Sequence, residues 1–152
     1  MAATITNERP DSEAARALID ELEAHLSPLY PVESRHGYSV EKLLREGVAF
    51  FVIRHDGVPA GCGGIQLFGS EDGEIKRMYV RPALRGLGLA KRMLEHLAAY
   101  ARQHGARLLR LETGIHQVEA IGLYEKMGFK RIAPFAPYRD DPLSRCYEKP
   151  IE

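Results

Sequence analysis

Residues 74–100, EIKRMYVRPALRGLGLAKRMLEHLAAY, decide how the rest of this chain is organised. Residues 74–80 predict a strand, and a glycine-rich turn at 85–90 leads directly into an amphipathic helix that ends near residue 104. Apolar residues recur along this helix at the spacing of one buried face, at positions 90, 93, 94, 97, 98 and 101. The stretch therefore predicts a strand, a tight turn and a helix that packs on a sheet.

The turn has the features of an anion site. Gly86 and Gly88 let the backbone approach a phosphate closely, and the first N–H groups of a helix have no partner within that helix. The helix dipole adds about half a positive charge at the same end. A short glycine motif is also compatible with a plain strand-to-helix connection, so the turn alone leaves both interpretations open.

Spacing separates the ligand classes that use such a turn. A Walker loop requires Lys and then Ser or Thr directly after its last glycine, whereas Lys91 here follows Ala90 and precedes Arg92. A dinucleotide fingerprint requires a third glycine at position 91. The pattern that remains is Arg85-x-x-Gly88-x-Ala90, which argues against a nucleotide- or dinucleotide-dependent enzyme.

Size and composition limit the remaining classes. A chain of 152 residues suits one domain, 1–152, and its 21 basic and 21 acidic residues balance, so bulk charge favours neither nucleic acid nor an anionic membrane. No apolar run is long enough for a membrane span, and the first ten residues do not resemble a signal peptide. The six histidines and the two cysteines, Cys62 and Cys146, show no metal-ligand spacing. We expect a cytoplasmic protein with reduced thiols and no metal.

The order of predicted elements indicates one α/β domain of the α+β type. Ser12 and Ser39 are capping residues for two early helices, and Asp56-Gly57 is a strong hairpin turn. A crossing helix between two strands implies that those strands, 74–80 and 107–113, run parallel. The predicted strands are 2–8, 48–53, 59–67, 74–80, 107–113, 129–132 and 144–149, and the predicted helices are 13–26, 40–45, 88–104 and 117–127.

A second motif, residues 117–129 (QVEAIGLYEKMGF), makes the assignment more specific. It is similar to the Asn-x-x-Ala-x-x-Leu-Tyr-x-x-x-Gly-Phe pattern that closes the active site in the GNAT superfamily of N-acetyltransferases. Arg85-x-x-Gly88-x-Ala90 resembles the signature with which that superfamily binds the pyrophosphate of acetyl-coenzyme A. The two motifs occur in the family's order, and the resemblance covers residues 48–132 well. One departure is Gln117, which stands where the family usually has Asn.

The resemblance implies a GNAT fold, with a central mixed, mostly antiparallel sheet flanked by helices and splayed between strands 74–80 and 107–113. It also implies that the pantetheine arm enters between these strands and bonds to the backbone there, as an added strand would. The residues that it assigns to acetyl-CoA are Met78, Tyr79, Val80, Arg85, Gly86, Leu87, Gly88, Leu89, Ala90, Gln117 and Tyr124.

Acyl transfer to an amine also needs an acid for the leaving thiolate and a base for the amine. Tyr124 is the predicted acid, because a phenol with a pKa of about 10 is protonated at neutral pH. Without the family match, a packed helical tyrosine would be the preferred interpretation.

Glu74 is the predicted base, acting through a water, and it matches a strand glutamate that serves this role in some members. Alternation along the strand predicts that Glu74, Lys76, Met78 and Val80 share one face. An ordinary ion pair of Glu74 with a neighbouring basic residue is the competing interpretation, and Glu112 or a water is the alternative base.

The acceptor site is expected from two polar segments, residues 28–39 and 133–143, which the fold would place around its entrance. A glutamate there would favour a cationic amine. The predicted acceptor-binding residues are Tyr30, Glu33, His36, Glu112 and Tyr138.

The sequence therefore predicts an acetyl-CoA-dependent N-acetyltransferase that acts by direct transfer in a ternary complex, on a primary amine of a small molecule or amino acid. Two alternatives on the same fold stay open: a protein N-terminal or lysine acetyltransferase, and a non-catalytic acyl-CoA-binding sensor. The acceptor's identity, the acyl length and whether the chain forms a homodimer are not decided by the sequence.

Overall fold

A single mixed sheet forms the centre of the computed structural model, which describes residues 2–35, 38–69 and 71–151. Its seven strands follow the order β1-β2-β3-β4-β5-β7-β6. β4 and β5 pair in parallel and the other neighbours are antiparallel, which confirms the predicted mixed sheet. The bounds are β1 Ala3–Asn7, β2 Ala49–His55, β3 Val58–Phe68, β4 Asp72–Val80, β5 Leu108–Gly114, β6 Lys130–Ile132 and β7 Ser144–Pro150.

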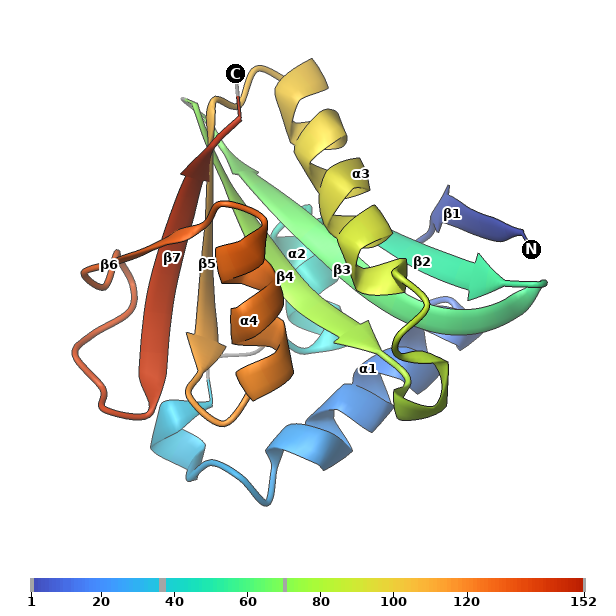
Figure 1. Ribbon diagram of the computed structural model, residues 1–152, viewed down its shortest axis with the longest axis horizontal. Coiled ribbons are helices and arrows are strands. Elements are labelled where there is room, and N and C mark those ends of the chain that lie inside the picture. The colour runs from blue at the N-terminus through green and yellow to red at the C-terminus, as the bar shows by residue number, and fades with distance from the viewer. Residues whose placement is uncertain (1, 36–37, 70, 152) are drawn as a thin grey trace.

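Helices cover both faces of this sheet (Figure 1). α3 (Leu89–Gln103) and α4 (Val118–Lys126) lie on one face, and α1 (Glu13–Leu26) and α2 (Val40–Arg45) lie on the other. The predicted caps of the two early helices are present, because Ser12 Oγ accepts from Ala15 N and Ser39 Oγ accepts from Lys42 N, each at 3.1 Å. Within the described residues, no helix combines the length and the apolar character that a membrane span requires.

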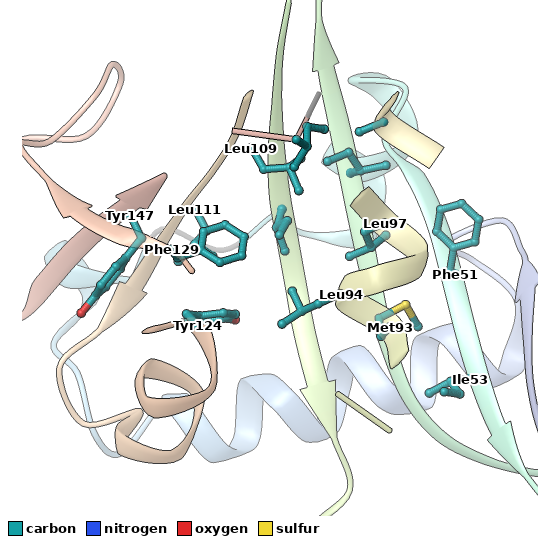
Figure 2. Close-up of a cluster of buried hydrophobic side chains, with 14 of the residues drawn as sticks. Phe51, Ile53, Met93, Leu94, Leu97, Leu109, Leu111, Tyr124, Phe129 and Tyr147 are labelled. Carbon is teal, nitrogen blue, oxygen red and sulfur yellow. The ribbon is translucent and has the colours of Figure 1, made fainter. Parts of the chain in front are cut away.

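Two hydrophobic cores result, one on each face, and β2 contributes to both because successive side chains of a strand point to opposite faces. Phe51 and Ile53 belong to the core beneath α3 and α4, whereas Phe50 and Val52 belong to the core beneath α1 and α2. Figure 2 shows the first core, in which the apolar face of α3 packs over β3 and β4. This confirms the predicted helix stripe and the prediction that residues 48–53 form a strand covered on both faces.

β4 contains a β-bulge that the sequence pattern does not reveal. The register with β3 shifts at this point, and Arg77 has a φ of 56°. Because a bulge adds one residue to one strand, it reverses the alternation that follows. Glu74 and Lys76 therefore lie on the face of α1 and α2, whereas Met78 and Val80 pack on the core beneath α3. The prediction that these four side chains share one face is wrong.

The packing of α3 on the sheet can be tested at Leu97, which is fully buried in the first core. Leu97→Ala removes packed methyl groups and leaves a cavity, so we expect the free energy of unfolding to fall by about 2–5 kcal/mol. The matched control is Leu67→Ala, the same change at a side chain that is 37% exposed. Urea denaturation measures both, and equal losses at the two positions would contradict this packing.

Candidate functional site

β4 and β5 separate soon after they begin to pair. They pair over three residues, of which the last are Glu74 and Arg110. Beyond this point β4 continues to Val80 and β5 to Gly114, and Figure 1 shows the two strand ends apart, with α4 in front of them. A cavity of about 410 Å³, here called the first cavity, lies between the end of β4, the turn after it, and the first residues of α3 and α4.

The glycine turn forms one wall of the first cavity. Gly86 and Gly88 have φ values of 85° and 78°, a conformation that favours glycine, and the space where a Cβ would stand is open at both positions. The first helical hydrogen bond of α3 runs from Arg92 N to Gly88 O at 3.1 Å, so the N–H groups before Arg92 have no helical partner. The first turn of α3 carries Lys91 and no acidic residue. This wall fits a pyrophosphate.

Arg85 lines the first cavity and contacts both the end of β4 and the start of α4. Its Nε donates to the Val80 carbonyl at 3.0 Å, and its Nη1 lies 3.7 Å from Glu119 Oε1 at the start of α4. The side chain of Glu119 is 83% exposed, so this ion pair contributes at most about 1 kcal/mol. The contact with Val80 leaves that residue's carbonyl already bonded within the chain, at a position where the sequence predicts contact with a ligand.

Tyr124 also lines the first cavity. It is buried between β4 and β5, and its ring packs edge-on against Phe129 with the ring centres 5.8 Å apart (Figure 2). Burial raises the pKa of the Tyr124 phenol above its ordinary value of about 10, so the hydroxyl keeps its proton at neutral pH. Among the described residues the hydroxyl has no hydrogen-bond partner, and it is therefore available to a ligand.

A second cavity of about 130 Å³ adjoins the first on the face of α1. Five residues line both cavities and mark the junction between them: Leu22, Met78, Gln117, Ala120 and Tyr124. The Tyr124 side chain therefore lines both cavities.

Two ion pairs hold α1 against β4 at this junction. Arg81 binds the Glu21 carboxylate through Nε at 3.0 Å and Nη2 at 2.7 Å, and this contact holds the pKa of the Glu21 carboxyl below its usual range. Two residues along, Glu23 pairs with Arg77, the bulge residue of β4. Leu22 lies between these anchors in the sequence, and they position it at the junction.

Glu74 forms part of a buried polar cluster in the second cavity. Lys76 Nζ and the Tyr138 hydroxyl both donate to its Oε2, at 2.8 and 2.5 Å. Burial and the neighbouring carboxylate raise the pKa of Tyr138 well above its ordinary value. Both donors bind the same oxygen, and among the described residues none donates to Oε1 of Glu74, so that oxygen can bind a ligand or a water. The ion pair with Lys76 is therefore present without excluding a role for Glu74 as a base.

Tyr30 closes the second cavity beside the end of β5. Its hydroxyl accepts from His116 N at 2.9 Å and donates to Gln117 Oε1 at 3.2 Å. The ring lies directly against Gly114, where an added Cβ would overlap the Tyr30 hydroxyl. An added Cβ at Gly114 would therefore push the Tyr30 ring aside. Gln117, predicted to contact a ligand, accepts from Tyr30 through its Oε1 and also lines the first cavity.

The structure gathers most of the predicted site residues. Tyr30, Glu74, Glu112 and Tyr138 line the second cavity with the junction residues. Leu87 does not line the first cavity and Glu33 is exposed outside both, so the structure does not support these two positions, and His36 lies outside the described residues. The predicted residues that line the first cavity are Met78, Tyr79, Val80, Arg85, Gly86, Gly88, Leu89, Ala90, Gln117 and Tyr124.

Sequence reasoning missed other residues of the second cavity: Leu22, Leu26, Arg35, Tyr38, Lys76 and Arg77. Arg35 and Tyr38 lie in the 28–39 segment, whose unusual density of aromatic and charged side chains was the available signal. Leu22 and Leu26 of α1 carry no such signal, because core packing alone also requires apolar residues at these positions.

Cysteine and metal chemistry find no support in the described part of the chain. Burial raises the pKa of the Cys62 thiol to about 12, and its Sγ donates to the Arg77 carbonyl at 3.3 Å, as expected of a small packed residue rather than a nucleophile. No group of three His, Cys, Asp or Glu side chains among the described residues is placed to hold a metal ion.

Comparisons with known proteins agree with this geometry. Residues 14–129 match the model of the acetyltransferase (GNAT) family. The chain is 42% identical to the IAA acetyltransferase of Azospirillum brasilense over 149 residues, which cover 97% of each chain.

Two solved structures with a similar fold are described as an N-acyltransferase and an N-acetyltransferase. A candidate acyl-CoA N-acyltransferase from Klebsiella pneumoniae superposes with a TM-score of 0.84 at 39% identity, covering 99% of this chain and 98% of the other. The PaiA N-acetyltransferase of Thermoplasma acidophilum, in complex with coenzyme A, has a TM-score of 0.77 at 21% identity over 99% of each chain. The latter likeness shows the fold, and that fold binds coenzyme A in this neighbour.

The contact between Tyr30 and Gly114 can be measured as a coupling energy. Gly114→Ala forces the Tyr30 ring away from its two hydrogen-bond partners, so the unfolding free energy should fall by about 1–3 kcal/mol. In a Tyr30→Ala background the same change should cost much less, giving a coupling within the range of about 0.5–3 kcal/mol seen for touching residues. An equal cost in both backgrounds, measured by urea denaturation, would show that the two residues do not restrain each other.

Proposed function

Because this chain belongs to the GNAT family and is an acyltransferase, we propose that it transfers an acetyl group from acetyl-CoA to a primary amine of a small molecule or amino acid. Transfer is direct, in a complex that holds both substrates. This proposal rests on the observation that the two cavities adjoin each other and share Tyr124 and Met78 as lining residues.

The first cavity is the proposed acetyl-CoA site. Gly86 and Gly88 leave room for the pyrophosphate beside the free N–H groups of α3, and Lys91 adds positive charge. The edge of β4 that faces β5 is unpaired after Glu74, so it can accept the pantetheine arm as an added strand. Acetyl-CoA supplies the acetyl group as a thioester, which must reach the junction for transfer.

Two side chains transfer the protons, Tyr124 at the junction and Glu74 in the second cavity. The amine nitrogen forms a bond to the acetyl carbonyl carbon while the carbon–sulfur bond breaks, so nitrogen must lose a proton and sulfur must gain one. Glu74 Oε1 takes the proton from nitrogen, directly or through a water, and the Tyr124 hydroxyl gives its proton to sulfur. A proton returned from Glu74 to Tyr124 through water restores the starting state. Glu112, which also lines the second cavity, is the alternative base.

The second cavity favours a small acceptor over a protein. Its volume is about 130 Å³, less than a third of that of the first cavity, and Tyr30 and Tyr138 line it. A small amine fits this space, whereas a lysine on a folded protein would need a broad open approach. The first test is a screen of small amines, amino acids and peptide N-termini with acetyl-CoA, in which thiol release reports turnover.

The coenzyme site is tested by thermal unfolding with acetyl-CoA alone. A hundredfold excess over the dissociation constant should stabilise the protein by about 2.7 kcal/mol, which raises the melting temperature by several degrees. Gly88→Asp places a carboxylate in the proposed pyrophosphate site and should abolish this shift. The matched control is Gly57→Asp, since Gly57 has a φ of 82° and open space around its missing Cβ, but lies in the β2–β3 turn.

Both glycine variants share the backbone strain of a left-handed residue, so they should lose similar stability in the absence of ligand. They should differ in their response to acetyl-CoA, which the Gly57 variant retains. A shift that survives in the Gly88 variant would make the turn a structural connection only.

The role of Tyr124 is tested by removing its hydroxyl. Tyr124→Phe keeps the ring and its contact with Phe129, so acetyl-CoA affinity should change little, while kcat falls by about two to four orders of magnitude. Tyr147→Phe is the control, because Tyr147 is equally buried and its hydroxyl binds Glu125, but it lines neither cavity. A fully active Tyr124→Phe variant would reduce Tyr124 to a packing residue, and weaker acetyl-CoA binding with unchanged kcat would make its hydroxyl a coenzyme anchor.

A further inference from the structure

Tyr30 belongs to the 28–39 segment, yet its hydroxyl bonds to the start of α4. The ring is buried against Gly114, at the point where an added Cβ would stand, so it has little room to move. The hydroxyl accepts from the His116 N–H at 2.9 Å and donates to Gln117 Oε1 at 3.2 Å. A fixed ring therefore presents a fixed hydroxyl to the Gln117 amide.

These two bonds determine which end of the Gln117 amide faces Tyr30. A backbone N–H can only donate, so the Tyr30 oxygen accepts from His116 and the hydroxyl proton is left to donate. Among the described residues, the acceptor that this proton reaches is Gln117 Oε1. An amide turned the other way would set its own N–H groups against that proton. The two donors on Gln117 Nε2 therefore lie at the end of the amide away from Tyr30.

The donors on Gln117 Nε2 are available to a ligand. Among the described residues no group accepts from this atom, and it is not closed off from solvent. Gln117 is the N-cap residue of α4, and it lines both cavities. An amide N–H is a neutral donor that suits a carbonyl oxygen. The pantetheine arm of acetyl-CoA carries such oxygens in its amides and in its thioester.

From this chain of hydrogen bonds we propose that Tyr30 is a positioning residue for acetyl-CoA that acts through Gln117. The Tyr30 hydroxyl holds the amide in the orientation in which Nε2 donates to a carbonyl oxygen of the pantetheine arm. Tyr30 itself lines the second cavity and not the first, so its effect on the coenzyme is indirect. This inference rests on the proposed function, because it requires that the first cavity binds acetyl-CoA.

The test measures acetyl-CoA binding by calorimetry in the absence of any acceptor. Tyr30→Phe keeps the ring and removes the hydroxyl, so the dissociation constant should rise by about three- to tenfold, the worth of one hydrogen bond between neutral groups. Gln117→Met keeps the length of the side chain but cannot donate, and it should raise the constant by a similar factor. The double variant should bind no more weakly than Gln117→Met alone, because Tyr30 acts through the amide.

Two controls separate positioning from general damage. Tyr147→Phe removes another buried, hydrogen-bonded hydroxyl from a residue that lines neither cavity, and it should leave acetyl-CoA binding unchanged. The nucleotide half of coenzyme A, which ends at the pyrophosphate, should bind equally to the wild-type protein and to Tyr30→Phe. An equal loss of affinity for this half and for acetyl-CoA would overturn the inference, because it would indicate a displaced α4.

Other results would overturn the inference while the acetyltransferase proposal stands. They are unchanged acetyl-CoA affinity in Tyr30→Phe or Gln117→Met, additive losses in the double variant, and a rise in KM for an accepted amine alone, which would make Tyr30 an acceptor contact. If Tyr30→Phe does not fold, Gly114→Ala displaces the same hydroxyl and should weaken acetyl-CoA binding to the same degree. A wild-type protein that does not bind acetyl-CoA overturns the proposed function and the inference together.

Discussion

The early separation of β4 from β5 is the constraint on which the rest of the structure depends. Parallel pairing ends at Glu74 and Arg110, and beyond it each strand follows a different partner, β4 with β3 and β5 with β7. Backbone N–H and C=O groups that are buried without hydrogen-bond partners cost free energy. The edges of β4 and β5 that no longer pair with each other therefore need other hydrogen-bond partners. Arg85 Nε donates a hydrogen bond to the Val80 carbonyl, and the rest of the unpaired edge of β4 faces the first cavity.

The bulge at Arg77 gives this opening two chemically different sides. Before the bulge, Glu74 and Lys76 point into the polar second cavity, and after it Met78 and Val80 turn toward the apolar core beneath α3. A regular strand would have kept Glu74 and Met78 on the same face. The extra residue therefore separates Glu74 and Lys76 from the apolar side chains that follow them in β4.

Segments far apart in the sequence complete the site through a few contacts. Tyr30 reaches the start of α4 only because Gly114 has no side chain. The ion pairs of Glu21 with Arg81 and of Glu23 with Arg77 hold α1 against the end of β4. The second cavity is therefore lined by residues from several elements.

The sequence by itself determined the elements, the mixed sheet, both cores and the glycine turn, because these depend on local spacing: helical and strand periodicity, Ser12 and Ser39 as caps, and left-handed glycines. It also led to Tyr124 and Gln117 through a motif of adjacent residues. Only the tertiary structure decided which face Glu74 occupies, since one bulge reverses the alternation without a sequence signal. The tertiary structure likewise left Glu33 outside both cavities, placed Arg35 in the wall of the second cavity and joined Gln117 to Tyr30, because these outcomes depend on how distant segments pack against each other.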